Sequence, residues 1–200
     1  MKVFSNMFSN KIKIMDFEKS KENKRPIENL LNVEIETERL TLKPVSLEYK
    51  DMIFSEFTDE VTKFMFPSTP KQVEDTEKFI NDSREKIKKG EDLGISIFNK
   101  ETNEFLGNGG IHNLNTKTPE LGIWIKKSAH GNKYGREAVA GLKEWADKNI
   151  EYEYLLYPVA KENIASRKIP ESLGGKVMRE LIAKKQNGED MEEVEYWIYK

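Results

Sequence analysis

The chain has 200 residues, of which 37% are hydrophobic and 10% aromatic, enough to fill the core of one soluble domain. Thirty-three basic and thirty-five acidic residues leave a formal charge of -2, so neither nucleic acid nor an anionic membrane is the expected partner. The absence of cysteine excludes disulfides, thiolate metal sites and cysteine nucleophiles, and two histidines make a histidine-based metal site improbable. We therefore expect a cytoplasmic protein that binds a small molecule or a protein segment.

Residues 1–34 differ from the rest of the chain because they are rich in lysine and their apolar residues follow no period. Polar residues interrupt every apolar run, so neither a signal-peptide core nor a membrane span is predicted there. We expect an N-terminal extension, either mobile or docked as a small piece, followed by one domain over residues 35–200.

The elements of that domain can be predicted in chain order. Apolar and polar side chains alternate within residues 35–45, and Pro44 ends the alternation, which predicts a strand. Ser46 then suits the N-cap of a first helix. A second helix is predicted from Val73 to Gly90 by the helical spacing of its apolar residues. The remaining predictions are strands over 93–100, 104–114 and 120–126, a helix over 134–149, a strand over 152–159, a helix over 163–173 and a final hairpin around Asn187-Gly188.

This order has no internal repeat and no linker. It predicts a single domain of the α/β (α+β) class, with a mixed, mostly antiparallel sheet of about seven strands flanked by about four helices.

The stretch SAHGNKYGREAV, residues 128–139, lies between the strand that ends in LGIWI and a helix. Glycine brings no Cβ into the path of an incoming group, and the first N–H groups of a helix lack partners and carry the positive end of its dipole. With Lys133 and Arg136 nearby, the loop suits a phosphate or a pyrophosphate. The alternative is a glycine-punctuated turn that binds nothing.

At these residues the sequence resembles the GNAT superfamily of acetyl-CoA-dependent N-acetyltransferases, whose phosphate-binding motif is Q/R-x-x-G-x-G/A. The resemblance covers residues 35–200 and is greatest to the ribosomal-protein alanine N-acetyltransferase branch, through TERLTLKP, ELGIWI, GREA and NIASRKIPESLGG. It implies that acetyl-CoA is the co-substrate, that no metal is used, and that the pyrophosphate-binding loop is formed by His130, Gly131, Asn132, Lys133, Tyr134, Gly135 and Arg136.

The resemblance has further implications for the coenzyme site. Trp124 and Ile125 would pair their backbone with the pantetheine arm, while Asn163 would be either a coenzyme contact or a helix cap. Two residues depart from the loop motif, because His130 replaces Gln or Arg and Lys133 replaces Gly. Lys133 must then adopt the loop conformation with its side chain present.

Acetylation of an amine requires a proton acceptor, and the sequence offers two candidates. Glu120 would share a strand face with Gly122 and Trp124 and is the first candidate; the alternative is a solvent-facing acid without a chemical role. His112 is the second candidate, although a buried, hydrogen-bonded structural histidine is the stronger interpretation.

The departing thiolate requires a hydrogen-bond donor or a proton. Many family members place a tyrosine seven residues after the motif asparagine, but this chain has Pro170 there. By the resemblance, Ser166 would be the donor to the coenzyme sulfur; the alternative is a first-turn serine that bonds the backbone.

These observations favour an enzyme that moves acetyl from acetyl-CoA to a primary amine, either a protein N-terminus or a small-molecule amine, by direct attack. A non-catalytic acyl-CoA-binding or regulatory module with the same fold is the alternative, favoured by Lys133 and Pro170. The expected partners are coenzyme A and an amine acceptor, with no nucleic acid and no membrane, and the chain would be a monomer or a homodimer. In the family the acceptor pocket is built by about residues 46–90 and 185–196, whose acids would favour a cationic acceptor.

Overall fold

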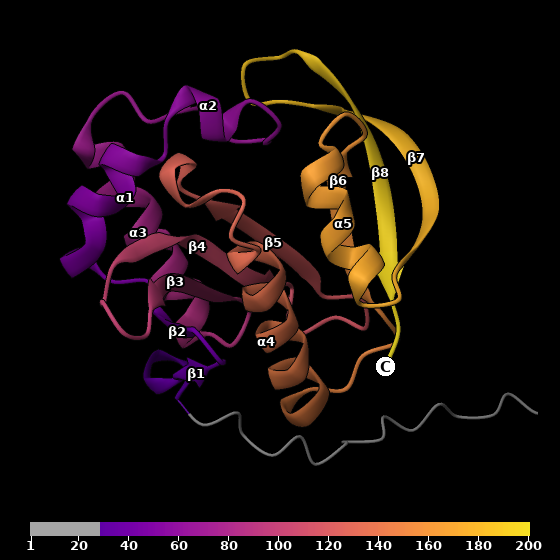
Figure 1. Ribbon diagram of the computed structural model, residues 1–200, viewed down its shortest axis with the longest axis horizontal. Helices are drawn as coiled ribbons and strands as arrows, with labels where there is room; N and C mark the ends of the chain where they lie inside the picture. Colours follow the sequence, from indigo (N-terminus) through magenta and orange to yellow (C-terminus); the bar gives the residue numbers. More distant parts are fainter. Residues whose placement is uncertain (1–28) are drawn as a thin grey trace, which may run out of the picture.

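The computed structural model describes residues 29–200, so most of the extension expected over residues 1–34 lies outside the described residues. One eight-stranded sheet runs through the domain (Figure 1). Its strands are β1 (Ile35–Glu36), β2 (Leu40–Pro44), β3 (Leu93–Asn99), β4 (Phe105–His112), β5 (Glu120–Ile125), β6 (Leu155–Ala160), β7 (Lys176–Lys184) and β8 (Asp190–Ile198). Their order is β1-β2-β3-β4-β5-β6-β8-β7, and within the described part of the chain only β5 and β6 are parallel neighbours.

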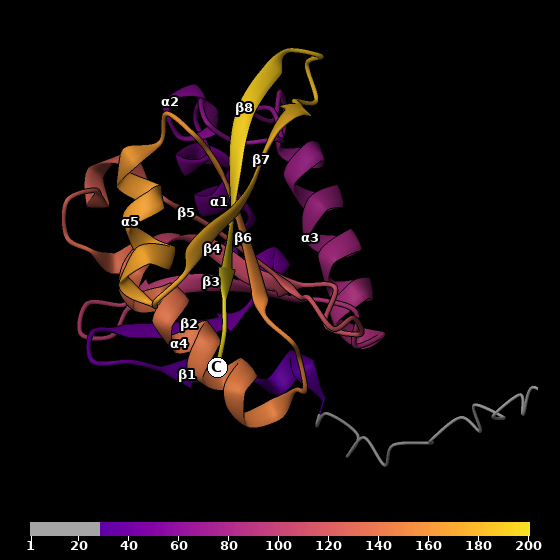
Figure 2. The ribbon, with the colours of Figure 1, turned by 90° about the vertical axis from the view of Figure 1, so that its right-hand side faces the viewer.

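Helices cover both faces of the sheet. They are α1 (Lys50–Glu56), α2 (Asp59–Thr62), α3 (Val73–Lys88), α4 (Tyr134–Asn149) and α5 (Ile164–Ser172), with short 3-10 helices η1 (Leu30–Asn32), η2 (Leu47–Tyr49) and η3 (Lys127–Ala129). Figure 2 shows α3 on one side of the sheet and α4 with α5 on the other. None of the helices within residues 29–200 has both the length and the apolar character that a bilayer crossing requires.

The predicted fold class is confirmed, with two corrections to the element counts. Residues 29–200 contain eight strands and five α-helices. The single strand expected over residues 35–45 is two strands, and a one-turn helix, α2, interrupts the segment after α1. β1 and β2 pair across a tight turn in which the Thr37 N–H donates to the Leu40 carbonyl at 2.9 Å. Ser46 is a cap as predicted, but it accepts from Glu48 N at the start of η2 rather than from α1.

The larger hydrophobic core lies between the sheet and α4, where Leu142 and Ala146 are fully buried against β-strand leucines and isoleucines. Burial of each such large aliphatic side chain contributes about 1.5–3 kcal/mol. A smaller cluster on the opposite face joins Ile53 of α1 and Ile80 of α3 to aromatic side chains of β3 and β4. Leu30 is buried in the larger core, so the packing of the domain begins before residue 35.

Candidate active site

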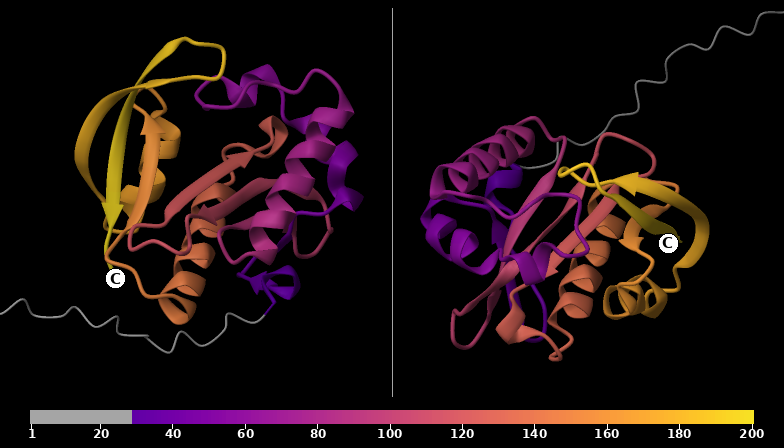
Figure 3. Two further views of the ribbon diagram at one scale, coloured as in Figure 1. Left: turned by 180° about the vertical axis from the view of Figure 1, so that it is seen from behind. Right: turned by 90° about the horizontal axis from the view of Figure 1, so that it is seen from above.

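Two neighbouring strands in the middle of the sheet separate after a single paired position. β5 and β6 pair only at Glu120 and Leu156, where the Leu156 N–H donates to the carbonyl of Pro119 at 2.8 Å. Figure 3 shows the two strands diverging from this point toward the end of β5. Gly122 to Ile125 are partly exposed although β5 is the fifth of eight strands. We call this region the β5–β6 opening.

The backbone of β5 directs alternate peptide groups into the opening. The Pro119 carbonyl faces β6, whereas the Lys126 N–H donates to a β4 carbonyl at 2.8 Å. Because peptide groups alternate in direction along a strand, those of Ile123 and Ile125 face the opening and that of Trp124 faces β4. Of the two residues expected to pair with a pantetheine arm, Ile125 therefore has the required direction and Trp124 does not. Ile123, which the sequence did not single out, has it as well.

The side chain of Trp124 has a different environment from its backbone. It lies on the α1–α3 face of the sheet, with its ring 4.9 Å from Phe57 and 5.8 Å from Phe105 between centroids. Aromatic pairs at such separations add to the stabilisation from burial. Trp124 thus forms an apolar wall beside the opening on that face.

The loop after β5 leaves the first N–H groups of α4 without intrahelical partners. The first helical bond joins Glu137 N to the Lys133 carbonyl at 3.2 Å, so the amides of residues 134–136 have no acceptor within the helix. Lys133 adopts a left-handed conformation with φ 63°, and Gly131 has φ 85°. The replacement of the motif glycine by Lys133 is therefore accommodated by a left-handed lysine, at an energetic cost that glycine would not incur.

The two loop glycines, Gly131 and Gly135, have different surroundings. A Cβ at Gly131 would meet nothing within 4 Å, which leaves free space beside its backbone. A Cβ at Gly135 would lie 3.3 Å from Ile169 Cδ1 and 3.5 Å from Ile125 Cγ1. Gly135 thus allows the close packing of α4 against α5 and β5, and its role in making room for a ligand stays a prediction.

His130 and Asn132 both hold the loop in place. His130 Nε2 lies 2.8 Å from the Ile125 carbonyl, so the ring donates a hydrogen bond to the end of β5. The Asn132 amide donates to the carbonyl of Ala129 at 3.2 Å. These contacts give the residue in the Q/R position of the motif an anchoring role.

A contact network that the sequence analysis missed connects this loop to the β1–β2 turn. Glu137 accepts hydrogen bonds from Thr37 Oγ1 at 2.6 Å and from Arg39 N and Nε at 2.7 Å each. Arg39 also donates to the Asn132 carbonyl at 3.1 Å, and its guanidinium lies 4.7 Å from the ring centroid of Tyr134. Burial alone would raise the pKa of Glu137, but the hydrogen bonds from Thr37 and Arg39 hold it below its ordinary value. The TERL and GREA motifs are therefore two halves of one support for the loop.

Glu120 and His112 are cross-strand neighbours at the closed end of the opening, on the α1–α3 face. Glu120 is partly buried, and this burial raises the pKa of its carboxyl; the nearby His112 acts in the opposite direction. A raised carboxylate pKa makes Glu120 a stronger proton acceptor than an exposed glutamate.

His112 is hydrogen-bonded, as the structural interpretation predicted, but it is not buried. Its side chain is 43% exposed, and Nδ1 lies 3.1 Å from Oδ2 of Asp92. Nε2 lies 3.4 Å from the position that a Cβ of Gly122 would occupy, so it faces the partly exposed part of β5.

Asp92 fixes the orientation of His112. Its side chain is 7% exposed and also accepts from Asn113 N at 2.9 Å and from Lys86 Nζ at 3.3 Å. Burial would raise the pKa of Asp92, but the hydrogen bonds with His112 and Asn113 outweigh it and lower the pKa to about 2. Asp92 is thus a permanent carboxylate partner for the imidazole, and the sequence analysis did not identify it.

The α5 residues expected near the coenzyme occupy the other face of the sheet. Asn163 caps α5 by accepting from Ser166 N at 3.1 Å, which is one of its two expected roles, and its contact with the coenzyme stays a prediction. The Ser166 hydroxyl lies 2.8 Å from the hydroxyl of Tyr157 on β6, and this side-chain contact takes the place of the expected bond to the backbone. Ile169, one turn further along α5, contacts Gly135, which brings α5 beside the loop.

The pieces expected to form the acceptor pocket meet at one end of the molecule. Gln186 of the β7–β8 turn donates from its backbone to the Phe66 carbonyl at 3.0 Å and accepts from Ser68 N at 3.1 Å. A pocket of about 180 Å³ lies at this junction. Four of the acids in these pieces face a lysine: the pairs are Glu60 with Lys127, Glu189 with Lys185, Asp190 with Lys184 and Glu192 with Lys161. Their contribution to a cationic acceptor site is correspondingly small.

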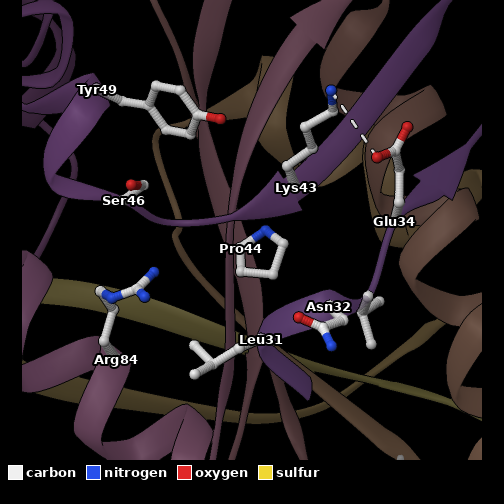
Figure 4. A pocket seen from close by; sticks show the side chains of 9 residues that line it. Leu31, Asn32, Glu34, Lys43, Pro44, Ser46, Tyr49 and Arg84 are labelled. Atoms are coloured by element: carbon white, nitrogen blue, oxygen red, sulfur yellow. Dashed lines mark ion pairs between the residues drawn. The ribbon is translucent and has the colours of Figure 1, made fainter. Parts of the chain in front are cut away.

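Other polar clusters lie away from the opening. Figure 4 shows a pocket of about 260 Å³ between η1, β2 and α3, in which Glu34 and Lys43 form an ion pair of 3.8 Å. It contains none of the residues that the sequence analysis named as site residues. Within residues 29–200 no group of three or more histidines and acids could hold a metal ion.

Comparison with known proteins agrees with this geometry. The Acetyltransferase (GNAT) domain matches residues 39–176. The N-acetyltransferase p20 of Bacillus licheniformis, itself uncharacterized, is 32% identical over 143 residues, which are 68% of this chain and 79% of p20.

Two solved structures share the fold. The acetyl transfer enzyme of Salmonella typhimurium that modifies the N-terminal serine of 50S ribosomal subunit protein L7/L12 has a TM-score of 0.73 at 15% identity, covering 84% of this chain and 99% of that one. Mycobacterium smegmatis RimJ, in complex with CoA-disulfide, has a TM-score of 0.71 at 18% identity and covers 80% and 81%. Since the domain match spans most of the chain, this protein belongs to the GNAT family and is an acetyl-CoA-dependent acetyltransferase.

Proposed function

We propose that the protein transfers the acetyl group of acetyl-CoA to a primary amine by direct attack, the acceptor being a protein N-terminus or a small-molecule amine. The observation that carries the proposal is the β5–β6 opening, which has unpaired helix amides at one end and two proton acceptors at the other. The absence of cysteine from the sequence favours direct attack over a cysteine-bound acetyl intermediate.

The residues of the loop fit the pyrophosphate of the coenzyme. The amides of residues 134–136 lack partners within the helix, Gly131 leaves free space, and Lys133 and Arg136 add positive charge. Such amides at a helix N-terminus favour anions. The peptide group of Ile123 and the N–H of Ile125 would hold the arm as a neighbouring strand would, since the Ile125 carbonyl already accepts from His130. Acetyl-CoA supplies the acetyl group in activated form, as a thioester.

The acceptor amine requires a base in this site. An alkylamine with a pKa near ~10.4 is only about 0.1% neutral at pH 7.4. Glu120 is the first choice for the proton acceptor because burial raises its pKa and because it shares the α1–α3 face with the partly exposed Gly122. His112, oriented by Asp92, is the second choice on the same face.

The non-catalytic alternative rested on Lys133 and Pro170. Lys133 keeps the loop in a conformation that leaves the α4 amides free, and Pro170 is accommodated near the end of α5. Neither residue removes the proton acceptors of the opening, and Ser166 would be the donor to the thiolate in place of the tyrosine that Pro170 replaces. We therefore propose an active enzyme.

Release of coenzyme A thiol from acetyl-CoA tests the proposal. The acceptor panel would contain peptides with free N-termini, the same peptides with blocked N-termini, polyamines and aminoglycosides, with mass spectrometry to locate the acetyl group. We expect turnover with at least one free primary amine and none with its blocked counterpart. Binding of acetyl-CoA without turnover across the panel would instead support the binding module.

A further inference from the structure

The Ser166 hydroxyl has one side-chain partner, and that partner is a buried tyrosine. Ser166 Oγ on α5 and Tyr157 OH on β6 are 2.8 Å apart. Tyr157 is 2% exposed and belongs to the large core, whereas Ser166 is partly exposed. The backbone of Ser166 is fixed by its bond to the cap residue Asn163, so the hydroxyl is held in place from two directions.

Counting donors and acceptors decides which hydroxyl donates. Each hydroxyl has one proton, and the pair uses one of the two. If Ser166 donated, the phenol proton of Tyr157 would be buried without an acceptor among the described residues, which is unfavourable. If Tyr157 donates, the proton left over belongs to Ser166, which can turn it toward solvent or a ligand. The second arrangement leaves no buried donor unsatisfied.

Tyr157 can keep this donor role throughout the reaction. Burial raises its pKa to about 12, although the hydrogen bond with Ser166 acts in the opposite direction. The phenol therefore stays protonated at any pH at which the enzyme would work.

We propose that Tyr157 is a positioning residue that donates to Ser166 Oγ and so directs the Ser166 proton into the β5–β6 opening, toward the leaving sulfur. This inference rests on the proposed function. In the acetyl transfer a C–N bond forms and the C–S bond breaks, the electron pair stays on sulfur, and the amine proton goes to the base. Ser166 donates a hydrogen bond to the developing thiolate and keeps its own proton. A thiolate whose conjugate acid has a pKa near ~8.5 leaves without full protonation.

The sequence offers no direct sign of this pair. Tyr157 lies in the apolar run YEYLLYPV, which predicts only a strand, and Ser166 lies nine residues later in another element. Pro170 fills the position where many family members place a tyrosine. In this chain a tyrosine hydroxyl on β6 instead contacts Ser166.

Steady-state kinetics with acetyl-CoA test the inference on four variants: Tyr157→Phe, Ser166→Ala, the double variant, and Tyr152→Phe. Tyr152 is the matched control, since it also donates its phenol proton to a side chain, that of Asp147, and is absent from the proposed site. We expect Tyr157→Phe to lower kcat about 3- to 10-fold with the KM for acetyl-CoA nearly unchanged, and Ser166→Ala to lower it about 10- to 100-fold. The double variant should be no slower than Ser166→Ala, because Tyr157 acts only through Ser166.

The outcomes separate this inference from the proposed function. An inactive wild type would overturn the proposed function and the inference with it. An active wild type with a Tyr157→Phe rate equal to that of the control, or with independent effects of the two substitutions, would overturn the inference alone. Site-specific 3-fluorotyrosine at position 157 covers the case in which Tyr157→Phe does not fold. Its more acidic phenol is a stronger donor, so kcat should rise; an unchanged or lower kcat would count against the inference.

Discussion

Replacement of Arg39 by alanine is expected to weaken coenzyme A binding because it removes contacts that hold the loop, beyond any effect on the stability of the whole fold. Arg39 donates to the Asn132 carbonyl at 3.1 Å and stacks on Tyr134, and both contacts are lost in Arg39→Ala. The same substitution leaves Glu137 without its cationic partner in the first turn of α4. A negative charge at this position disfavours the phosphates that the helix amides would bind.

The magnitude follows from the exposure of the contacts. Side-chain exposure is 43% for Arg39 and 17% for Glu137, so the ion pair is partly screened and contributes about 0.2–1 kcal/mol. The guanidinium over Tyr134 adds about 0.5–1 kcal/mol. Together the two contacts contribute about 1–2 kcal/mol to the free energy that holds the loop in place. Losing it corresponds to an affinity for coenzyme A that is about 5- to 30-fold lower.

Isothermal titration calorimetry with coenzyme A measures this affinity, and thermal denaturation measures the fold. Arg84→Ala is the matched control, because Arg84 also donates to a backbone carbonyl, that of Val45 at 2.9 Å, but lies on α3 away from the loop. We expect weaker binding for Arg39→Ala only. If both variants bind coenzyme A as the wild type does, while Arg39→Ala melts earlier, then Arg39 supports the fold alone and the reasoning is refuted.

Three further substitutions test the other parts of the site. Glu120→Gln should lower kcat at neutral pH far more than it changes the amine KM, with partial recovery at high pH as free amine increases; a flat pH response would transfer the base role to His112 or water. Lys133→Gly should stabilise the fold by about 0.5–1 kcal/mol, because it relieves the left-handed lysine, and should weaken coenzyme A binding more at low salt than at high salt; tighter calorimetric binding would contradict this role for the ammonium. The pKa of Asp92 is lowered to about 2, so its contribution to stability is present above pH about 4 and is lost as the pH falls toward 2. Urea denaturation should therefore show Asp92→Asn less stable than wild type at pH 6, with a gap that narrows below pH 4; a constant gap would argue against the charge interaction.

The sequence predicted what depends on local pattern. Periodicity located α3 and α4, Asn187-Gly188 located the last hairpin, and the glycines on either side of Asn132 located the loop. The loop conformation follows from a few adjacent residues, so its motif could be recognised despite His130 and Lys133. The element order predicted from these patterns also fits the resemblance to GNAT proteins.

The contacts that sequence analysis missed connect residues far apart in the chain. Thr37 and Arg39 bind Glu137 about a hundred positions later, and Asp92, just before β3, contacts His112 at the end of the neighbouring β4. No spacing rule joins such residues, because the sheet order brings them together. The contact of Gly135 with Ile169 was missed for the same reason, because Ile169 belongs to α5.

The separation of β5 from β6 gives the two faces of the sheet different parts of the proposed reaction. Glu120, Gly122 and Trp124 point to the α1–α3 face, whereas Leu121, Ile123 and Ile125 point to the core beneath α4 and α5. Tyr157 and Ser166 lie on this second side, so the proton acceptors for the amine and the donor to the leaving sulfur are separated by the sheet itself. In the proposed reaction, the carboxylate that would take the amine proton is kept apart from the hydroxyl that would stabilise the thiolate, and the opening between the strands would connect them. Because side chains alternate along a strand, a one-residue shift of β5 would exchange both sets at once. The register in which Glu120 pairs with His112 and Leu156 is therefore as important to the proposed chemistry as the identity of the residues.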